Sequence, residues 1–297
     1  DVSRVRPWFV RVSAVHRVPR HREHPIALVG DIELLVVPDA VGLLADYADV
    51  YPDVPADAWG PHRALYPELF AGEAWRLPCR SFLVRSAGVT VLVDTSVGPP
   101  GLWDWTAESE GLLPAALEEL GLHRDEIDVV LLTHLHIDHI GWNADLEGKP
   151  FFPRSRYVLH RHALEFARTR PGLPHIRRCV ESLVDRFERV EGETELAPGV
   201  RAFPTPGHYP GHMAVRLSSD GREAVLLADV AVHPALLDQP DWAYVSDLDP
   251  DTAADTRRSL LAELVDRDVL VACGHYPGSG IGRVVTRDSR VVWEELS

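Results

Sequence analysis

The sequence predicts a layered α/β protein. Short β-rich apolar segments alternate along the chain with segments of helical spacing, and the most polar motifs directly follow predicted strands. The chain has 297 residues, of which 45% are hydrophobic and 25% are charged, a composition typical of globular proteins. A chain of this length can bury a substantial core without the help of disulfides.

The first predicted elements are two strands and a helix. Phe82–Arg85 and Thr90–Val93 are β-rich, and the turn-forming pair Ala87-Gly88 separates them. The second of these strands runs into a short polar segment that begins with Asp94. Leu112–Leu120 has helical spacing and stops at a glycine, as helices often do.

The later elements continue the alternation. Ile127–Leu132 is apolar apart from one aspartate, which predicts a buried strand. Arg156–Leu159 predicts another strand, and His162–Arg168 predicts the start of a helix. The rest of the chain predicts strands over Val200–Phe203, Met213–Leu217, Ala224–Leu227 and Val269–Ala272, and a helix over Thr252–Val265.

The chain shows no convincing linker, so we expect a single domain over residues 1–297. Residues 1–80 carry no diagnostic motif and predict N-terminal strands with an irregular extension. Within them, residues 40–78 are rich in Pro, Trp, Tyr and Asp, which favours a long irregular insertion or cover. Residues 81–297 form the expected motif-bearing core.

Charge and cysteine content narrow the function classes. The 30 basic and 45 acidic residues give a net charge of −15, which disfavours nucleic-acid binding because phosphate contacts need clustered basic side chains. No apolar run approaches the ~18 residues of a membrane span, and residues 1–23 lack a signal-peptide hydrophobic segment. Three separated cysteines, Cys79, Cys179 and Cys273, disfavour a disulfide framework or a cysteine-based metal site, and we expect a cytoplasmic location.

The strongest motif directly follows the predicted strand Ile127–Leu132. It reads Thr-His-Leu-His-Ile-Asp-His-Ile-Gly-Trp and contains four metal-ligand side chains, His134, His136, Asp138 and His139. An extended chain places His134 and His136 on the same side, and the following turn can direct the other two toward a second point. Imidazole and carboxylate ligands without thiolates suit zinc or another first-row divalent ion.

This HxHxDH pattern resembles the signature of the metallo-β-lactamase superfamily. The resemblance implies three further ligands, which are found in the order that the family has them: His208 in a Pro-Gly-His turn, Asp229 after a strand, and His275 in a Cys-Gly-His segment. It also implies a four-layer αββα sandwich in which the motifs cluster at strand ends.

The same resemblance implies a ligand set and a mechanism. Site one would consist of His134, His136 and His208, site two of Asp138, His139 and His275, and Asp229 would bridge both. The cofactors would be two divalent ions, with zinc expected first and Mn, Fe or Co as alternatives. A hydroxide shared by the ions would attack the substrate, and Asp138 would act as a catalytic residue by taking a proton.

Four more residues are candidates for supporting the site or lining a substrate pocket. Asp94 resembles the family's strand-end aspartate that supports the metal-binding histidines, with a turn-forming role as the alternative. His212 is the second histidine of the Pro-Gly-His turn and is expected beside the ligands. His233 follows Asp229 by four residues and faces either the pocket or the surface, and Trp142 lines the pocket or packs in the core.

The motifs look closest to those of the acyl-homoserine lactonase and methyl parathion hydrolase group. Lactonases of this group typically place a Tyr three residues after the bridging Asp, but this chain has Val232 there. We therefore expect a dinuclear hydrolase of a lactone or activated ester whose oxyanion donor lies elsewhere. The alternatives are a thioesterase or β-lactam-type hydrolase of secondary metabolism, and a non-catalytic metal-binding or sensing protein. The expected partner is a small-molecule substrate, with no nucleic acid and no membrane, and a homodimer is compatible with the sequence.

Overall fold

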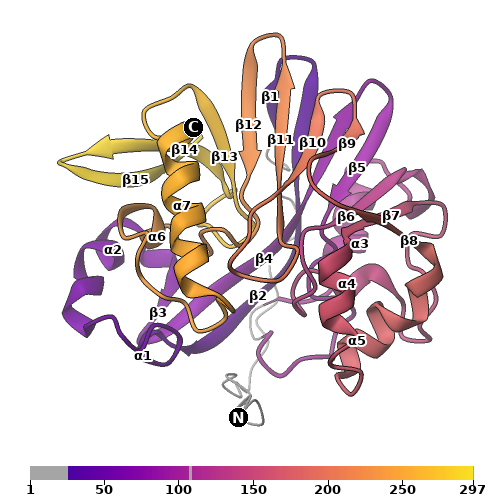
Figure 1. The fold of residues 1–297 in the computed structure, drawn as a ribbon, viewed down its shortest axis with the longest axis horizontal. Helices are drawn as coiled ribbons and strands as arrows, with labels where there is room; N and C mark the ends of the chain where they lie inside the picture. The colour runs from indigo at the N-terminus through magenta and orange to yellow at the C-terminus, as the bar shows by residue number, and fades with distance from the viewer. Residues whose placement is uncertain (1–25, 107–108, 297) are drawn as a thin grey trace.

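The computed structural model describes residues 26–106 and 109–296, in which two β-sheets pack face to face (Figure 1). The first sheet has the strand order β1-β2-β4-β5-β6-β7-β8, and β3 pairs with β4 beside this path. The second sheet has the order β15-β14-β13-β12-β11-β10-β9. Residues 1–25 lie outside the described part, and with them the expectations for the first 23 residues.

The strands of the first sheet are Ile26–Val29 (β1), Ile32–Asp46 (β2), Phe70–Ala71 (β3), Ala74–Ser86 (β4), Val89–Val93 (β5), Val129–Leu132 (β6), Arg156–His160 (β7) and Phe187–Val190 (β8). Those of the second are Thr194–Ala197 (β9), Val200–Pro204 (β10), Met213–Ser219 (β11), Arg222–Leu226 (β12), Val269–Ala272 (β13), Ile281–Arg287 (β14) and Arg290–Glu295 (β15). Every strand predicted from the sequence overlaps one of these.

Helices cover the outer face of each sheet. Four helices pack on the side of the second sheet: Tyr47–Val50 (α1), Gly60–Leu65 (α2), Ala235–Asp238 (α6) and Pro250–Leu264 (α7) (Figure 1). Three helices cover the first sheet: Leu113–Glu119 (α3), Arg161–Ala167 (α4) and Pro174–Cys179 (α5). Short 3₁₀ turns occupy Ala56–Trp59, Pro67–Leu69, Arg124–Glu126, Gly141–Asn143 and Glu181–Arg186. The resulting order of helix, sheet, sheet and helix is the expected αββα sandwich.

The alternation of side chains along β6 explains how one strand serves two cores. Val129 and Leu131 point between the sheets, where they join a core built from both of them. Val130 and Leu132 point to the other face and pack with the helices that cover the first sheet. A strand buried on both faces reads as a continuous apolar run, which is the pattern of this segment.

The parallel strands bring their carboxyl ends to common edges. In the first sheet β5, β6 and β7 run parallel, and in the second β12 and β13 do, with β10 pointing the same way because two antiparallel pairings separate it from β12. The sheets are joined at this edge, where the Met213 amide donates to the Thr133 carbonyl at 3.0 Å. Loops that leave these strand ends therefore converge on one place.

The expectation of an irregular segment over residues 40–78 is wrong at both of its ends. Residues up to Asp46 belong to β2, and residues from Ala74 belong to β4, the neighbouring strand. The register of this pair shifts between Pro38 and Ala40 and again between Leu43 and Asp46. Such bulges interrupt the two-residue period on which a strand prediction depends.

Asp39 lies at the first of these bulges and holds three segments together. Its buried carboxylate accepts hydrogen bonds from the amides of Val97, Gly98 and Leu113 and from the Trp142 indole, at 2.9–3.2 Å. Burial raises the pKa of Asp39, and these four donors act against that rise by stabilising the charged form. The residue thus fixes the loops that follow β5 and β6.

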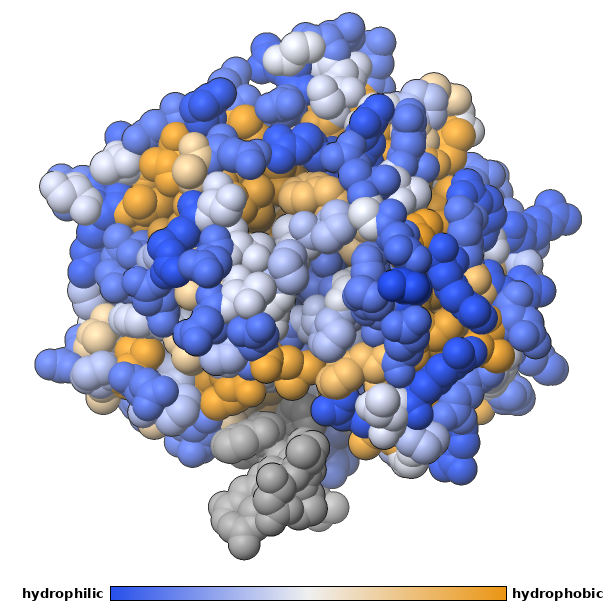
Figure 2. Space-filling view, in the orientation of Figure 1, coloured by the Kyte–Doolittle hydropathy of each residue, from blue (hydrophilic) through white to orange (hydrophobic). Residues whose placement is uncertain are grey.

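Hydrophilic side chains cover most of the face drawn in Figure 2, and apolar atoms show in smaller areas between them. Among the helices of residues 26–106 and 109–296, none is long and apolar enough to cross a membrane.

We expect Gly141→Ala to destabilise the fold because the loop after β6 packs directly on the loop after β5. A Cβ at Gly141 would lie 1.9 Å from the carbonyl carbon of Val97 and 2.0 Å from its oxygen. Both of these Val97 atoms belong to the backbone, so they cannot rotate away as the end of a side chain could. Overpacking of this kind costs about 1–3 kcal/mol. Urea denaturation would measure the loss, and Gly60→Ala, where nothing lies within 4 Å, should change the free energy of unfolding by less than ~1 kcal/mol. Equal stability of the two variants would contradict this packing argument.

Candidate metal centre

Tight backbone turns direct the predicted ligands toward one another. Asp94, directly after β5, has φ +62°, and Ala228, directly before Asp229, has φ +46°. Gly207, directly before His208, has φ +125°, and a Cβ there would lie 2.2 Å from the backbone nitrogen of Ala253. Left-handed conformations at non-glycine residues are strained and concentrate at functional sites. The ligand loops are therefore held in their conformations by the surrounding packing.

The first group of donor atoms consists of His134, His136, His208 and Asp229. His136 Nδ1 lies 3.0 Å from His134 Nε2 and 3.1 Å from His208 Nε2. Asp229 Oδ2 lies 3.6 Å from His134 Nε2 and 3.3 Å from His208 Nε2. These four atoms thus face a common point.

The second group consists of His139, His275, Asp229 and Asp138. His139 Nε2 and His275 Nε2 lie 3.3 Å apart, and each lies 3.3 Å from Asp229 Oδ1. Asp138 Oδ2 lies 3.8 Å from His139 Nε2 and 3.6 Å from His275 Nε2. Asp229 therefore presents one oxygen to each group.

These distances fit divalent metal ions. Ligand bonds of about 2.0–2.1 Å around a tetrahedral zinc ion give ligand-to-ligand distances of about 3.3–3.4 Å. The observed separations of 3.0–3.8 Å bracket that value. In addition, Asp229 Oδ1 is buried and accepts no hydrogen bond from the described residues, although two imidazole nitrogens lie 3.3 Å away. A cation between these atoms would satisfy the carboxylate and both rings.

In four of the five histidines of these groups, the opposite ring nitrogen is bound to a protein acceptor. His139 Nδ1 contacts Asp94 Oδ2, His208 Nδ1 contacts Asp247 Oδ1 and His275 Nδ1 contacts the Pro78 carbonyl, each at 2.8 Å, and His134 Nδ1 contacts Thr133 Oγ1 at 3.1 Å. Because these acceptors require an N–H on Nδ1, the Nε2 lone pair of each ring is free to face the group. Outer partners of this kind fix the tautomer of metal-binding histidines.

Asp94 lies where the resemblance places it, and it contacts two points of the loop that follows β6. Besides His139, it accepts from the amide of Thr133 and from its hydroxyl, both at 2.8 Å. The Thr133 hydroxyl in turn accepts from His134. One carboxylate thus orients a histidine of each group.

Burial keeps several of the imidazoles neutral. It lowers the pKa of His134 and His136 well below the usual range, and nearby histidines add to this effect. It also lowers the pKa of His212 to about 3. Neutral imidazole is the form that binds metal ions.

Elsewhere in the centre, neighbouring charges outweigh the effect of burial on the pKa of the ionisable side chains. Burial lowers the pKa of His139, but Asp229 and two further carboxylates outweigh it and raise the pKa well above the usual value. For His208 the hydrogen bonds that its ring donates to Asp229 and Asp247 likewise outweigh burial and raise the pKa to about 9. Burial raises the pKa of Asp229, but the charges of His139 and His275 bring it well below the usual range. The region around Asp229 therefore favours positive charge.

His212 lies beside the two groups, and both of its ring nitrogens form hydrogen bonds with other protein groups. Its Nδ1 pairs with the Thr205 hydroxyl at 2.8 Å, and its Nε2 accepts from the Asp229 amide at 3.1 Å. This ring holds the backbone that carries Asp229, which is consistent with a supporting role.

His233 lies neither in a pocket nor at the surface, and Trp142 takes the second of its two expected places, the core. His233 is fully buried among aromatic rings, where Nε2 contacts the Tyr47 hydroxyl at 3.2 Å and Nδ1 accepts from the Ala235 amide at 3.0 Å. Trp142 is buried, and its indole donates to Asp39. Because their polar atoms are bound to protein groups, both residues pack the core. Val232 is also buried, with 2% of its surface exposed.

Sequence reasoning missed four residues that the fold brings to the centre. Asp247 binds His208 and also pairs with Arg257 at 3.0 Å, and Tyr244 stacks on the His208 ring with centroids 6.0 Å apart. Cys79 lies with Asp138 and His275 in a group whose ligand atoms are within 4.8 Å of one another. None of the four belongs to a strand-end motif with spaced ligands, so the sequence carried no signal for them.

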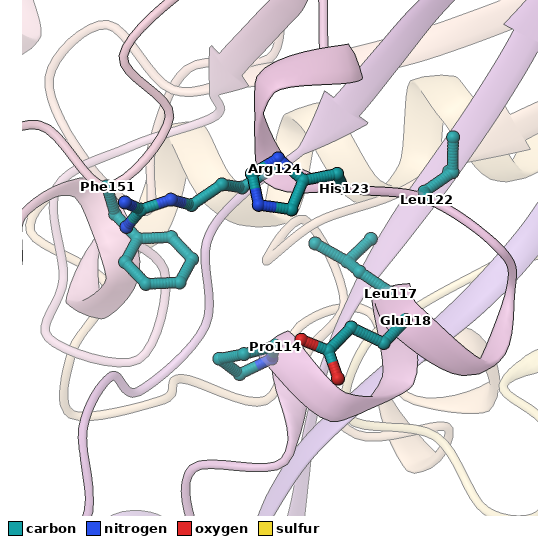
Figure 3. Close-up of a pocket in the computed structure, with 7 residues that line it drawn as sticks. All are labelled: Pro114, Leu117, Glu118, Leu122, His123, Arg124 and Phe151. Atoms are coloured by element: carbon teal, nitrogen blue, oxygen red, sulfur yellow. The ribbon is translucent and has the colours of Figure 1, made fainter.

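A separate surface pocket of about 270 Å³ contains none of the predicted site residues (Figure 3). It is lined by residues of α3, by residues of the segment before β6, and by Phe151 of the segment before β7. The Arg124 guanidinium lies 5.0 Å from the centre of the Phe151 ring. The segment before β6 enters that strand at the end opposite to the metal centre. The pocket and the centre therefore lie at different edges of the sheet.

We expect Asp247→Ala to destabilise the protein strongly. Asp247 and Arg257 each expose 1% of their side chains, so the variant would leave a buried guanidinium without its carboxylate. Loss of one partner of a buried pair costs about 3–5 kcal/mol. Asp241→Ala is the matched control, since Asp241 pairs with Arg258 at the surface and exposes 74% of its side chain. It should cost less than ~1 kcal/mol. Thermal and urea unfolding would measure both, and a mild effect of Asp247→Ala would contradict the buried pair.

Comparisons with known proteins agree with this geometry. The family described as the Metallo-beta-lactamase superfamily matches residues 74–275. An N-acyl homoserine lactonase of Bacillus thuringiensis is 25% identical over 229 residues, which cover 72% of this chain and 87% of that protein. The N-acyl homoserine lactonase AiiB of Agrobacterium fabrum is 30% identical over 185 residues, covering 54% of this chain and 64% of that protein.

Solved structures share the fold. AidC, a dizinc quorum-quenching lactonase in complex with a product, superposes with a TM-score of 0.80 at 20% identity, over 92% of this chain and 97% of AidC. The hydrolase AbOPH of the beta lactamase superfamily has a TM-score of 0.80 at 21% identity, over 94% and 99%. Together with the match over most of its length, the αββα layers and the clustered histidines and aspartates, this similarity shows that the chain belongs to the metallo-β-lactamase superfamily.

Proposed function

We propose that this chain is a metal-dependent hydrolase that uses two divalent ions to open a lactone or a similarly activated ester. The observation that carries the proposal is the pair of donor groups that share Asp229, with Oδ2 facing one and Oδ1 facing the other. The names of the relatives, N-acyl homoserine lactonases, support the substrate class.

His134, His136 and His208 would hold one ion, Asp138, His139 and His275 the other, and Asp229 would contact both. Zinc is the expected metal, in line with the dizinc centre named for AidC. When bound, such ions lower the pKa of a water molecule toward neutrality and polarise the ester carbonyl.

The chain's own residues supply the remaining functions. Asp138 is half-buried at the open side of the groups, and its Oδ2 faces His139 and His275. Its second oxygen is free to take the proton of the attacking water and pass it to the alkoxide of the ester bond that breaks. Asp94 and Asp247 keep the rings of His139 and His208 in place during these transfers.

Tyr244 is the candidate for the carbonyl contact that Val232 cannot make. Its half-buried ring lies parallel to His208, at an interplanar angle of 2°. Burial raises the pKa of its hydroxyl, and the charges of Asp138 and Asp229 add to this rise, so the hydroxyl keeps its proton. The segment directly after it is anchored at two points, because the Val245 amide donates to Val50 and Asp247 binds His208. A phenol held in this way can donate to the carbonyl oxygen of a substrate.

Two alternatives need the same centre. A thioesterase or β-lactam-type hydrolase would use identical groups on another acyl bond, and a metal-binding sensor would bind the ions without turnover. Rates on a lactone, a thioester, a β-lactam and an aryl ester would separate them.

We expect two metal ions per chain after expression with abundant zinc, because seven protein ligands converge on two groups. Elemental analysis would count them, and a chelator should abolish lactone hydrolysis. Asp229→Ala should lose at least one ion and its activity, because the shared carboxylate offsets the charge of both. His212→Ala should lose metal affinity by only about 10–100-fold, as outer partners do. One ion in every preparation, or turnover that resists chelation, would exclude the proposal.

We expect Tyr244→Phe to slow lactone hydrolysis by about 10²–10³-fold in kcat, the usual effect of removing one oxyanion donor. Metal content should stay at the wild-type value, because the ring that stacks on His208 is kept. Tyr276→Phe is the matched control, since that buried hydroxyl has no hydrogen-bond partner in the described structure. Steady-state kinetics on a lactone would compare them, and similar kcat values would remove Tyr244 from the mechanism.

A further inference from the structure

We propose that Cys79 Sγ is an additional, soft ligand at the second metal position, beside Asp138 and His275. The inference rests on the proposed dinuclear function and goes beyond its all-nitrogen-and-oxygen ligand set. Cys79 belongs to β4, and it lies 59 positions before Asp138 in the sequence, so no spaced motif connects the two.

The distances place the sulfur within reach of an ion. Cys79 Sγ, one oxygen of Asp138 and one nitrogen of His275 all lie within 4.8 Å of one another. A zinc–sulfur bond of about 2.3 Å and a zinc–nitrogen bond of about 2.1 Å separate the two ligand atoms by about 3.6 Å at a tetrahedral angle. Since the atoms lie at most 4.8 Å apart, a shift of the sulfur by at most about 1.2 Å brings it to the same ion as the other two atoms.

The second group is widest on the side where Cys79 lies. Asp138 Oδ2 is 3.6 and 3.8 Å from the two imidazole nitrogens, whereas the other three atoms are 3.3 Å apart. Cys79 shares a group with Asp138 and His275, the atoms of this wider side. A larger sulfur atom fits there without crowding the tighter side around Asp229.

The backbone fixes Cys79 in this place. Its neighbour Pro78 accepts the His275 Nδ1–H at 2.8 Å, which ties β4 to the loop that carries His275. Only 2% of Cys79 is exposed, and its closest backbone acceptor, the Leu77 carbonyl, lies at 3.9 Å. The thiol is thus held beside the group, and its backbone contact is too weak to compete with a metal ion.

Coordination by Cys79 would release a proton and would change which metal ions the second position prefers. As the sulfur–metal bond forms, the S–H bond breaks and its proton leaves for solvent. A thiolate ligand favours zinc, cobalt or cadmium over manganese and magnesium, which prefer oxygen. The second position should therefore select borderline or soft divalent ions.

Cobalt provides the test, because a thiolate bound to Co(II) gives an intense charge-transfer band in the near ultraviolet that nitrogen and oxygen ligands do not give. The metal-free full-length protein would be titrated with Co(II), and bound cobalt and lactone hydrolysis would be measured on the same samples. We expect the band in the wild type as the second position fills, and its complete loss in Cys79→Ser.

Cys273→Ser and Cys179→Ser are the matched controls. Cys273 is buried close to Asp229, but its thiol contacts the Ala228 and Ala231 carbonyls at 3.4 and 3.9 Å, and Cys179 lies under Gly141. Both variants should keep the band. X-ray absorption of the zinc-loaded wild type should contain a zinc–sulfur distance of about 2.3 Å.

The possible outcomes are distinguishable. Two bound cobalt ions and active hydrolysis without the band would overturn the role of Cys79 and leave the proposed function intact. A band that survives Cys79→Ser would assign the sulfur to another cysteine. Failure of the wild type to bind metal would overturn both proposals. If Cys79→Ser does not fold, the wild-type band and the zinc–sulfur distance, compared with the two controls, still decide the question.

Discussion

The centre of this protein depends on a buried carboxylate that faces two sets of imidazoles. Asp229 exposes 4% of its surface, yet five histidine side chains surround it. An unpaired carboxylate in such a place would cost several kcal/mol, and so would a cluster of charged histidines without it. The carboxylate and the histidines offset each other's cost of burial, and the two cations of the proposed function would satisfy both. The strained turn at Ala228 persists because this arrangement fixes it.

Further carboxylates accept hydrogen bonds from the outer ring nitrogens of these histidines. Asp94 joins the loop after β5 to the loop that carries the HxHxDH motif, and Asp247 joins His208 to Arg257 on α7. Asp39, farther out, holds the backbone of the β5 loop through two amides. The negative charge of the molecule is thus in part internal and structural. Because each carboxylate contacts more than one segment, the ligand geometry is set by the packing of the whole edge of the sandwich.

Aromatic side chains from residues 47–75 pack behind this centre. Tyr47, Trp59 and Trp75 surround the ring of His233, with centroids 5.3–5.6 Å apart, and so bury the segment that follows Asp229. Cys79 reaches the centre from β4 of the same region. The part of the chain without diagnostic motifs therefore packs behind the proposed ligands, and Cys79 is the donor that it would add to them.

The sequence by itself predicted the layered fold, which the structure confirms, and the seven residues proposed as metal ligands, because strand-end motifs such as His134-x-His136 are local patterns with fixed spacing. It did not reveal the long β2 and β4 strands, whose bulges hide the two-residue period. It assigned His233 to a pocket or the surface, whereas packing against aromatic rings 158–186 residues earlier in the chain encloses it. Tyr244, Asp247 and Cys79 emerged only from the tertiary structure, since their roles arise from contacts between distant segments. Single residues of this kind leave no pattern in a sequence, and their chemistry is set by the atoms that folding places beside them.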